Sequence, residues 1–231
     1  MKPNYSSALI IGVGAGLSAS LARLFAANGM GLALAARETG KLAALAAETG
    51  ASLHTCDAAD QGQVAALFAA LDGEGAPDVV VYNPSARVRG PLIELDPQAV
   101  ARAVQVTAIG AFFVAQEAVK RMQPAGHGAV LFTGASAGVK GYPQSASFAM
   151  GKFALRGLAQ SMARELHPKG IHVGHFVIDG GIRGAAHEVP PDSPDSMLDP
   201  DAIARSYWHF LEQDRSAWSW EIELRPWVER F

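Results

Sequence analysis

Short apolar runs alternate along the chain with stretches in which apolar residues recur at helical spacing. Short runs bounded by glycine or polar residues are typical of buried strands, and a spacing of about three to four residues is typical of helices. The pattern predicts strands at 8–11, 31–36, 52–56, 78–82, 128–133, 171–177 and 218–225. It predicts a helix that begins at 17 and further helices at 38–48, 61–71, 97–122, 145–166 and 200–211.

This alternation predicts an α/β fold, a Rossmann-like, doubly wound parallel sheet of seven strands. No shift in composition marks a domain boundary, so residues 1–231 are expected to form a single domain. Residues 183–200 contain four prolines and are expected to form a mobile substrate loop that sets specificity. The 97–122 helix is apolar on more than one face, which predicts that part of it meets another subunit.

Composition narrows the classes of partner. The formal net charge is −3 and no basic block occurs, which argues against nucleic acid as the main partner. Cys56 is the only cysteine, so no intrachain disulfide is expected and a reducing cytoplasm fits. The N-terminus has no signal-peptide pattern and no uninterrupted apolar run reaches membrane-spanning length, so no membrane partner is expected.

A glycine-rich turn follows the first predicted strand, with the spacing Gly12-x3-Gly16-x-Ser18. Glycines let the backbone approach a pyrophosphate, and the helix N-terminus behind them offers free N–H groups and a favourable dipole. The strand–turn–helix context therefore predicts a dinucleotide site here. The alternative is a tight turn whose glycines serve only close packing of the strand against the helix.

Further signs come in a fixed order, and they give the chain a resemblance to the short-chain dehydrogenase/reductase family over nearly its whole length. Asp57 follows the third strand, Asn83 the fourth and Asp179-Gly180-Gly181-Ile182 the sixth, while Lys152 stands at the lysine of a family Tyr-x-x-x-Lys motif. The resemblance implies a nicotinamide dinucleotide as cofactor and no metal. It assigns cofactor binding to Gly12, Gly14, Gly16, Leu17, Ser18, Arg37, Asp57, Ala58, Asn83, Lys152, Gly180 and Ile182.

The expected catalytic tetrad is degenerate. Phe148 holds the position of the family's tyrosine, Ala135 that of its serine, and Thr107 that of its asparagine, so only Lys152 remains. Phe148 and Lys152 are four residues apart and should face the same cleft. The chain therefore resembles a divergent subgroup with phenylalanine for tyrosine and an incomplete glycine motif.

Several residues are candidates for the missing proton donor. Ser136 qualifies only if its strand has already ended, because adjacent strand residues point to opposite faces. Tyr142 is an acid by type, but it precedes Lys152 by ten residues with Pro143 between, so it is not expected to share a helix face with Lys152. His175 lies within a strand and is expected to be a packed core histidine.

The end of the second strand bears on cofactor choice. Relatives that prefer NAD have an acidic residue there, whereas this chain has Ala36 and then Arg37. A guanidinium suits a 2′-phosphate, so NADP is favoured and NAD remains possible.

Two hypotheses follow. The first is an NADP(H)-dependent oxidoreductase that acts on a small apolar carbonyl or alkene compound with an acid other than tyrosine. The second is a dinucleotide-binding sensor or partner subunit without turnover. Either would be a cytoplasmic homodimer or homotetramer.

Overall fold

Seven strands pair in one fully parallel sheet, in the order β3-β2-β1-β4-β5-β6-β9. The computed structural model describes residues 5–184 and 189–229. The strands of this sheet are β1 (Ser7–Ile11), β2 (Gly31–Ala36), β3 (Ser52–Thr55), β4 (Val79–Tyr82), β5 (Gly128–Thr133), β6 (Ile171–Ile178) and β9 (Glu221–Leu224). The predicted seven-stranded, doubly wound sheet is therefore confirmed.

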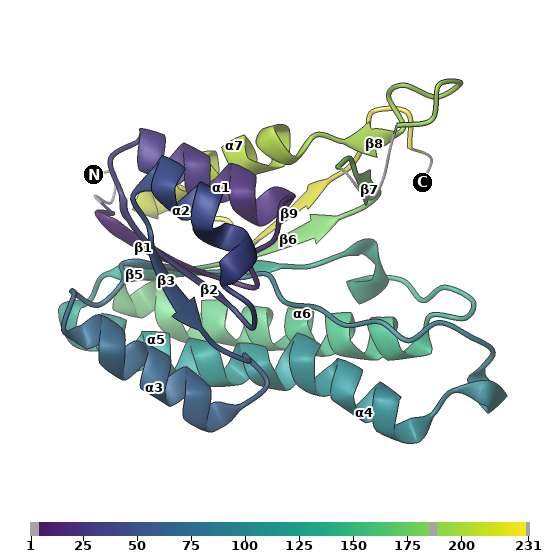
Figure 1. The fold of residues 1–231 in the computed structure, drawn as a ribbon, viewed down its shortest axis with the longest axis horizontal. Coiled ribbons are helices and arrows are strands. Elements are labelled where there is room, and N and C mark those ends of the chain that lie inside the picture. Colours follow the sequence, from purple (N-terminus) through teal and green to yellow (C-terminus); the bar gives the residue numbers. More distant parts are fainter. Residues whose placement is uncertain (1–4, 185–188, 230–231) are drawn as a thin grey trace.

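Helices cover both faces of the sheet (Figure 1). One layer holds α1, α2 and α7, and the other holds α3, α4, α5 and α6. Their bounds are α1 (Leu17–Ala27), α2 (Ala43–Thr49), α3 (Gln61–Asp72), α4 (Pro97–Val104), α5 (Gly110–Ala125), α6 (Ala146–Leu166) and α7 (Pro200–Leu211). The order of strands reverses between β1 and β4, and in such sheets ligands bind outside the carboxyl ends of the strands at that point.

Strand β4 shows why the strands are continuous apolar runs rather than alternating ones. All of its residues are buried, because a helical layer covers each face of the sheet. Val79 and Val81 belong to the core beneath α1 and α7, whereas Val80 and Tyr82 belong to the core beneath α3, α5 and α6. Two hydrophobic cores thus hold one sheet between them.

Two predicted helices differ in detail. The 38–48 helix begins later than predicted, because a 3₁₀ turn at Gly40–Leu42 precedes α2 and glycine is a poor residue for a helix interior. The 97–122 helix extends to Ala125 and contains a π-helical turn at Gln105–Ile109, a feature common near functional sites.

The segment expected to be a mobile loop contains a small strand. Strand β8 (Met197–Leu198) pairs in parallel with β7 (Gly181–Ile182) in a second, two-stranded sheet. The sequence pattern did not predict this pairing within the 183–200 loop, whose residues 185–188 lie outside the described residues. The mobility of the rest stays a prediction.

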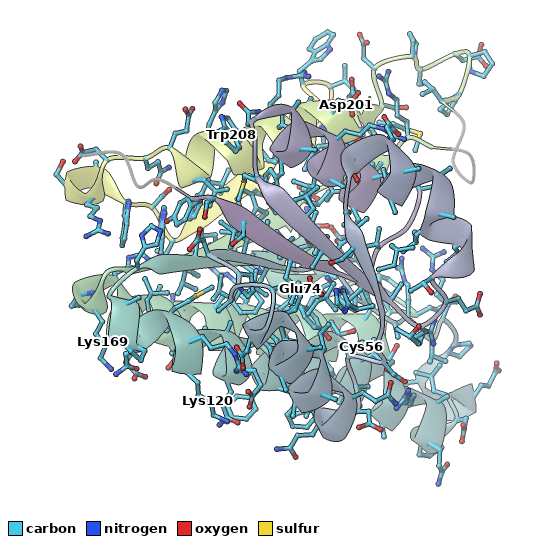
Figure 2. All side chains as sticks on the ribbon, turned by 60° about the vertical axis from the view of Figure 1, so that its left-hand side comes forward. Cys56, Glu74, Lys120, Lys169, Asp201 and Trp208 are labelled. Atoms are coloured by element: carbon cyan, nitrogen blue, oxygen red, sulfur yellow. The ribbon has the colours of Figure 1, made fainter. Side chains whose placement is uncertain are left out.

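The stretch Pro97–Ala125 is long and apolar enough to cross a membrane, by length and composition alone. Here it packs in the α3, α5 and α6 layer of the domain (Figure 1). Charged side chains lie on the outside of the layers: Lys120 and Lys169 on one side, and Asp201 on the other (Figure 2). The arrangement is that of helices packed on a sheet, with their polar faces outward.

Candidate cofactor and substrate site

Two cavities lie side by side and share Asn83 and Ser85 in their walls. The smaller, of about 330 Å³, is lined by the ends of β1, β2 and β3, and the larger, of about 810 Å³, by the segments after β4, β5 and β6 and by α6. Ile11 of β1 pairs with Ala35 of β2 and with Tyr82 of β4, so β1, β2 and β4 end at one edge of the sheet. We call the smaller cavity the adenosine cavity and the larger the reaction cavity, after the groups that they would hold.

The glycine turn fits a pyrophosphate. Gly12 has a φ of +80°, and an added Cβ would lie 2.7 Å from the Pro84 nitrogen, so this position requires glycine. A Cβ added at Gly14 or Gly16 would meet nothing within 4 Å, which leaves the backbone open on that side. Helix α1 begins directly behind it with no side-chain cap and no acidic residue in its first turn. Its first N–H groups are therefore available to an anion.

Ser18 stands where the glycine motif would have its third glycine, and its hydroxyl holds the turn in place. The Asn83 amide donates a hydrogen bond of 2.6 Å to the Ser18 hydroxyl, which donates one of 3.2 Å to the Gly12 carbonyl. This chain of hydrogen bonds ties the glycine turn to the end of β4. Ser18 and Leu17 are buried and line neither cavity, so they can offer a ligand only their backbone N–H groups.

The adenosine cavity gathers the residues predicted for that end. Arg37, Asp57 and Ala58 all line it. The Asp57 carboxylate accepts a hydrogen bond of 3.0 Å from the Ala59 N–H and another from Arg102, which fixes it at the end of β3. Lys41 lines the same cavity and was missed, because in the sequence it is an ordinary charged residue of a predicted surface helix.

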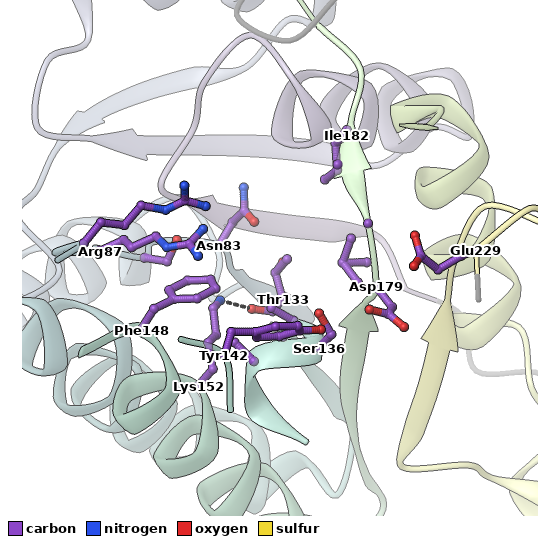
Figure 3. A pocket seen from close by; sticks show the side chains of 18 of the residues that line it. Asn83, Arg87, Thr133, Ser136, Tyr142, Phe148, Lys152, Asp179, Ile182 and Glu229 are labelled. Atoms are coloured by element: carbon purple, nitrogen blue, oxygen red, sulfur yellow. Dashed lines mark hydrogen bonds between the residues drawn. The ribbon is translucent and has the colours of Figure 1, made fainter. Parts of the chain in front are cut away.

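Lys152 is buried at the floor of the reaction cavity, where its amine donates a hydrogen bond of 2.6 Å to the Thr133 carbonyl (Figure 3). Burial lowers the pKa of Lys152 from 10.5 to about 7, because the charged form loses its hydration there. The amine thus sits where it can both hydrogen-bond a ligand and exchange a proton near neutral pH.

Phe148 lines the reaction cavity as predicted, together with Ala135, Ser136, Gly180 and Ile182. Figure 3 shows Arg87, Phe148 and Lys152 on one side of this cavity and Asp179 and Glu229 on the other. Strand β5 ends at Thr133, and Ser136 begins a 3₁₀ turn, so the condition for Ser136 to enter the site is met. A serine hydroxyl is therefore present beside the family's serine position.

The structure separates the remaining candidates. Thr107 is fully buried, lines neither cavity, and accepts a hydrogen bond of 3.1 Å from the Ala86 N–H, which positions the segment after β4. His175 is a core residue as expected, with Nδ1 2.9 Å from the Glu221 carboxylate. Tyr142 lies in the loop before α6 and not on its helix face, yet it lines the reaction cavity with Lys152.

Two arginines of the reaction cavity were not predicted. Arg87 and Arg89 both line its wall, on the segment that follows Asn83. In the sequence they are isolated charges in a segment expected to be a loop, and no spacing links them to Phe148. Only the packing of that segment against the start of α6 brings them to the site.

Comparison with known proteins agrees with this geometry. Residues 6–186 match the model of the short chain dehydrogenase family. This chain belongs to the short-chain dehydrogenase family. It is 36% identical to human 17-beta-hydroxysteroid dehydrogenase type 1 over 126 residues, which are 54% of this chain and 38% of the relative. The chain thus spans well under half the length of that relative.

Solved structures of the family superpose over nearly all of the chain. A short-chain dehydrogenase from Rhodopseudomonas palustris is 33% identical, with a TM-score of 0.85 over 97% of this chain and 100% of the other. An alcohol dehydrogenase from Thermococcus sibiricus, solved with 5-hydroxy-NADP, has a TM-score of 0.86 at 23% identity, over 98% of this chain and 99% of the other. The short-chain dehydrogenase fold is therefore shared in full.

Proposed function

We propose that this chain is an NADP(H)-binding oxidoreductase of the short-chain dehydrogenase type with a degenerate catalytic tetrad. Its substrate would be a small carbonyl or alkene compound with an apolar body. One observation carries the proposal: Gly12 lines the adenosine cavity, Lys152 lines the reaction cavity, and Asn83 lines both. A single extended dinucleotide can therefore reach from one cavity to the other past the open glycine turn.

NADP is favoured over NAD by the charges of the adenosine cavity. Arg37 is exposed at the end of β2, where an acidic side chain would repel a 2′-phosphate. Lys41 and Glu38 line the same cavity as an ion pair of 3.9 Å, so their charges offset each other and the preference rests on Arg37. A guanidinium matches a phosphate with two parallel N–H donors. The bound 5-hydroxy-NADP of the Thermococcus sibiricus relative supports this choice.

Reduction of a carbonyl group needs a hydride and a proton, and each can be assigned a source at the reaction cavity. A reduced nicotinamide, when bound, would supply the hydride. The proton must then come from the wall, and we assign it to the Lys152 amine, whose pKa of about 7 suits a proton donor at neutral pH. Ser136 would hydrogen-bond the substrate oxygen in place of the family's serine. Without a tyrosine between amine and substrate, turnover should be slow.

A second candidate function is a dinucleotide-binding sensor or partner subunit without turnover. Phe148 and Ala135 favour it, because neither side chain can donate a proton or hold a carbonyl group. Both candidates predict cofactor binding, and only the first predicts oxidation of NADPH in the presence of a carbonyl or alkene compound.

The protein is proposed to act in the cytoplasm as a homodimer or homotetramer. Its single cysteine is buried and free, which suits a reducing compartment. Large apolar side chains are exposed on the α5 and α6 layer, as expected where another subunit packs.

The test is a titration with NADPH followed by tryptophan fluorescence, and then a turnover assay by loss of NADPH absorbance with a panel of aldehydes, ketones and alkenes. Binding with slow turnover would support the oxidoreductase, and binding without turnover on any member would favour the sensor. A protein that binds neither NADPH nor NADH would contradict both candidate functions.

A further inference from the structure

Two guanidinium groups face the reaction cavity, and no carboxylate among the described residues neutralises them. Arg87 and Arg89 line the wall on the segment after β4. Within residues 5–184 and 189–229, no aspartate or glutamate lies within ion-pair distance of either one. The pKa of Arg87 is lowered, first by partial burial and then by the positive charge of Arg89, so the two cations repel each other.

The Arg87 side chain is held in place by neutral groups. Its guanidinium donates a hydrogen bond of 2.9 Å to the Ser145 hydroxyl and lies 4.9 Å from the centroid of the Phe148 ring. A cation over an aromatic face and a hydroxyl acceptor leave most guanidinium N–H donors free. Phe148 therefore supports a cation at the position where the family has its acid.

The segment that carries both arginines is fixed to α6, to the loop before α6 and to the π-helical turn at Gln105–Ile109. The Val88 N–H donates to the Ser147 hydroxyl and the Val88 carbonyl accepts from it, each at 2.9 Å, while the Gly90 N–H donates to the Gln144 carbonyl at 3.3 Å. The Ala86 N–H is bonded to Thr107. Two flexible side chains thus start from an ordered backbone, which reduces the entropy lost when they bind a ligand.

The acidic residues of the cavity lie on its other side and one of them is already paired. Asp179 is 3.7 Å from the Lys140 amine and 3.5 Å from the Arg225 guanidinium. Figure 3 shows Asp179 and Glu229 across the cavity from Arg87. The cavity is therefore polarised, with a positive end over Phe148 that no carboxylate of residues 5–184 and 189–229 compensates.

We propose that Arg87 and Arg89 form a carboxylate-binding site, so that the substrate is a small carbonyl or alkene compound with an apolar body and a carboxylate group. This inference rests on the proposed function for the reacting group and adds the charge of the substrate. A single carboxylate matches the planar fork of a guanidinium, and the ring of Phe148 covers the apolar body.

A matched pair of probes tests the charge: 4-formylbenzoate and its methyl ester, each titrated by calorimetry with and without NADPH. The carboxylate should bind more tightly than the ester. Arg87→Gln and Arg89→Gln should each weaken binding of the carboxylate by about tenfold to a hundredfold, as expected for loss of a charge-assisted hydrogen bond, and leave the ester unchanged. Arg87→Lys should keep part of the preference.

Arg205→Gln, an exposed arginine on α7 in the opposite helical layer, is the control and should leave both affinities unchanged. Equal binding of acid and ester, or a preference that survives in both Gln variants while NADPH still binds, would overturn the carboxylate site and leave the proposed function standing. A carboxylate preference in a protein that binds neither NADPH nor NADH would support the site and overturn the proposed function.

Discussion

The Lys152 amine lies 5.7 Å from the centroid of the Phe148 ring, one turn away on α6. The same ring lies beneath the Arg87 guanidinium. The Phe148 ring lies between the Lys152 amine and the Arg87 guanidinium. It shields the amine from water, and its π face stabilises the positive charge of the guanidinium. The aromatic residue at the tyrosine position therefore has a packing role on the reaction cavity although it has lost the acid.

Restoring the acid should raise activity. Phe148→Tyr with Ala135→Ser places a phenol four residues before Lys152 and a hydroxyl near it, both on the wall of the reaction cavity. We expect little ketone reduction by the unmodified protein and a gain of ~10²-fold or more in the double variant, the lower end of what a positioned acid contributes. Loss of NADPH absorbance with a ketone panel measures it. Fast ketone reduction by the unmodified protein would show that an efficient acid is already in place, and single substitutions of Ser136, Tyr142 and Lys152 would then identify it.

Stability should rise with pH because of Lys152. Its pKa is about 7 in the folded protein against 10.5 ordinarily, so between these pH values the unfolded chain binds more protons than the folded one. The free energy of unfolding should therefore increase from about pH 7 to pH 10, by a few kcal/mol at most, and the penalty is fully present below pH 7.

The variant Lys152→Met should remove this increase, measured by urea unfolding at both ends of the range. Lys120→Met, at a mostly exposed lysine of α5, is the matched control and should keep the wild-type slope. An identical slope in wild type and Lys152→Met would contradict the buried, easily deprotonated amine.

Cofactor choice should depend on Arg37. We expect NADPH to bind more tightly than NADH. Arg37→Ala should weaken the binding of NADPH by about tenfold and leave the affinity for NADH unchanged, since only NADPH has a 2′-phosphate for the guanidinium. Tryptophan fluorescence titrations of both cofactors measure it. If the two affinities are equal and do not change in the variant, the argument from the end of β2 fails.

Assembly should use the apolar surface of the α5 and α6 layer. Ile109, Phe112, Met150 and Phe153 are between 42% and 55% exposed there, more than expected for side chains of this size. We expect a homodimer or homotetramer by light scattering at micromolar concentration, and smaller particles for the double variant Phe112→Asp with Phe153→Asp. Ile93→Asp, at an exposed apolar residue before α4, is the control. A monomeric wild-type protein would rule the interface out.

The sequence by itself determined the fold, and with it the meeting of most residues predicted to bind the cofactor at one edge of the sheet. Val79–Tyr82 is apolar at every position because helices cover both faces of β4. Such a continuous apolar run is typical of a central parallel strand and can be recognised from the sequence. The glycine turn and Asn83 are also local features: one follows β1 and the other follows β4, and parallel strands bring their carboxyl ends to one edge without further information.

Only the tertiary structure decided which side chains share the reaction cavity and what charge they carry. Tyr142 enters through a loop, which helix spacing could not predict, and Thr107 turns inward to bind the Ala86 N–H. Arg87 reaches Phe148 because two remote serines bind its segment: Ser145, 58 residues after Arg87, and Ser147, 59 residues after Val88. Burial and distance between remote segments set the pKa of Lys152 and leave the two arginines without a carboxylate partner among the described residues, and neither quantity exists until the chain has folded.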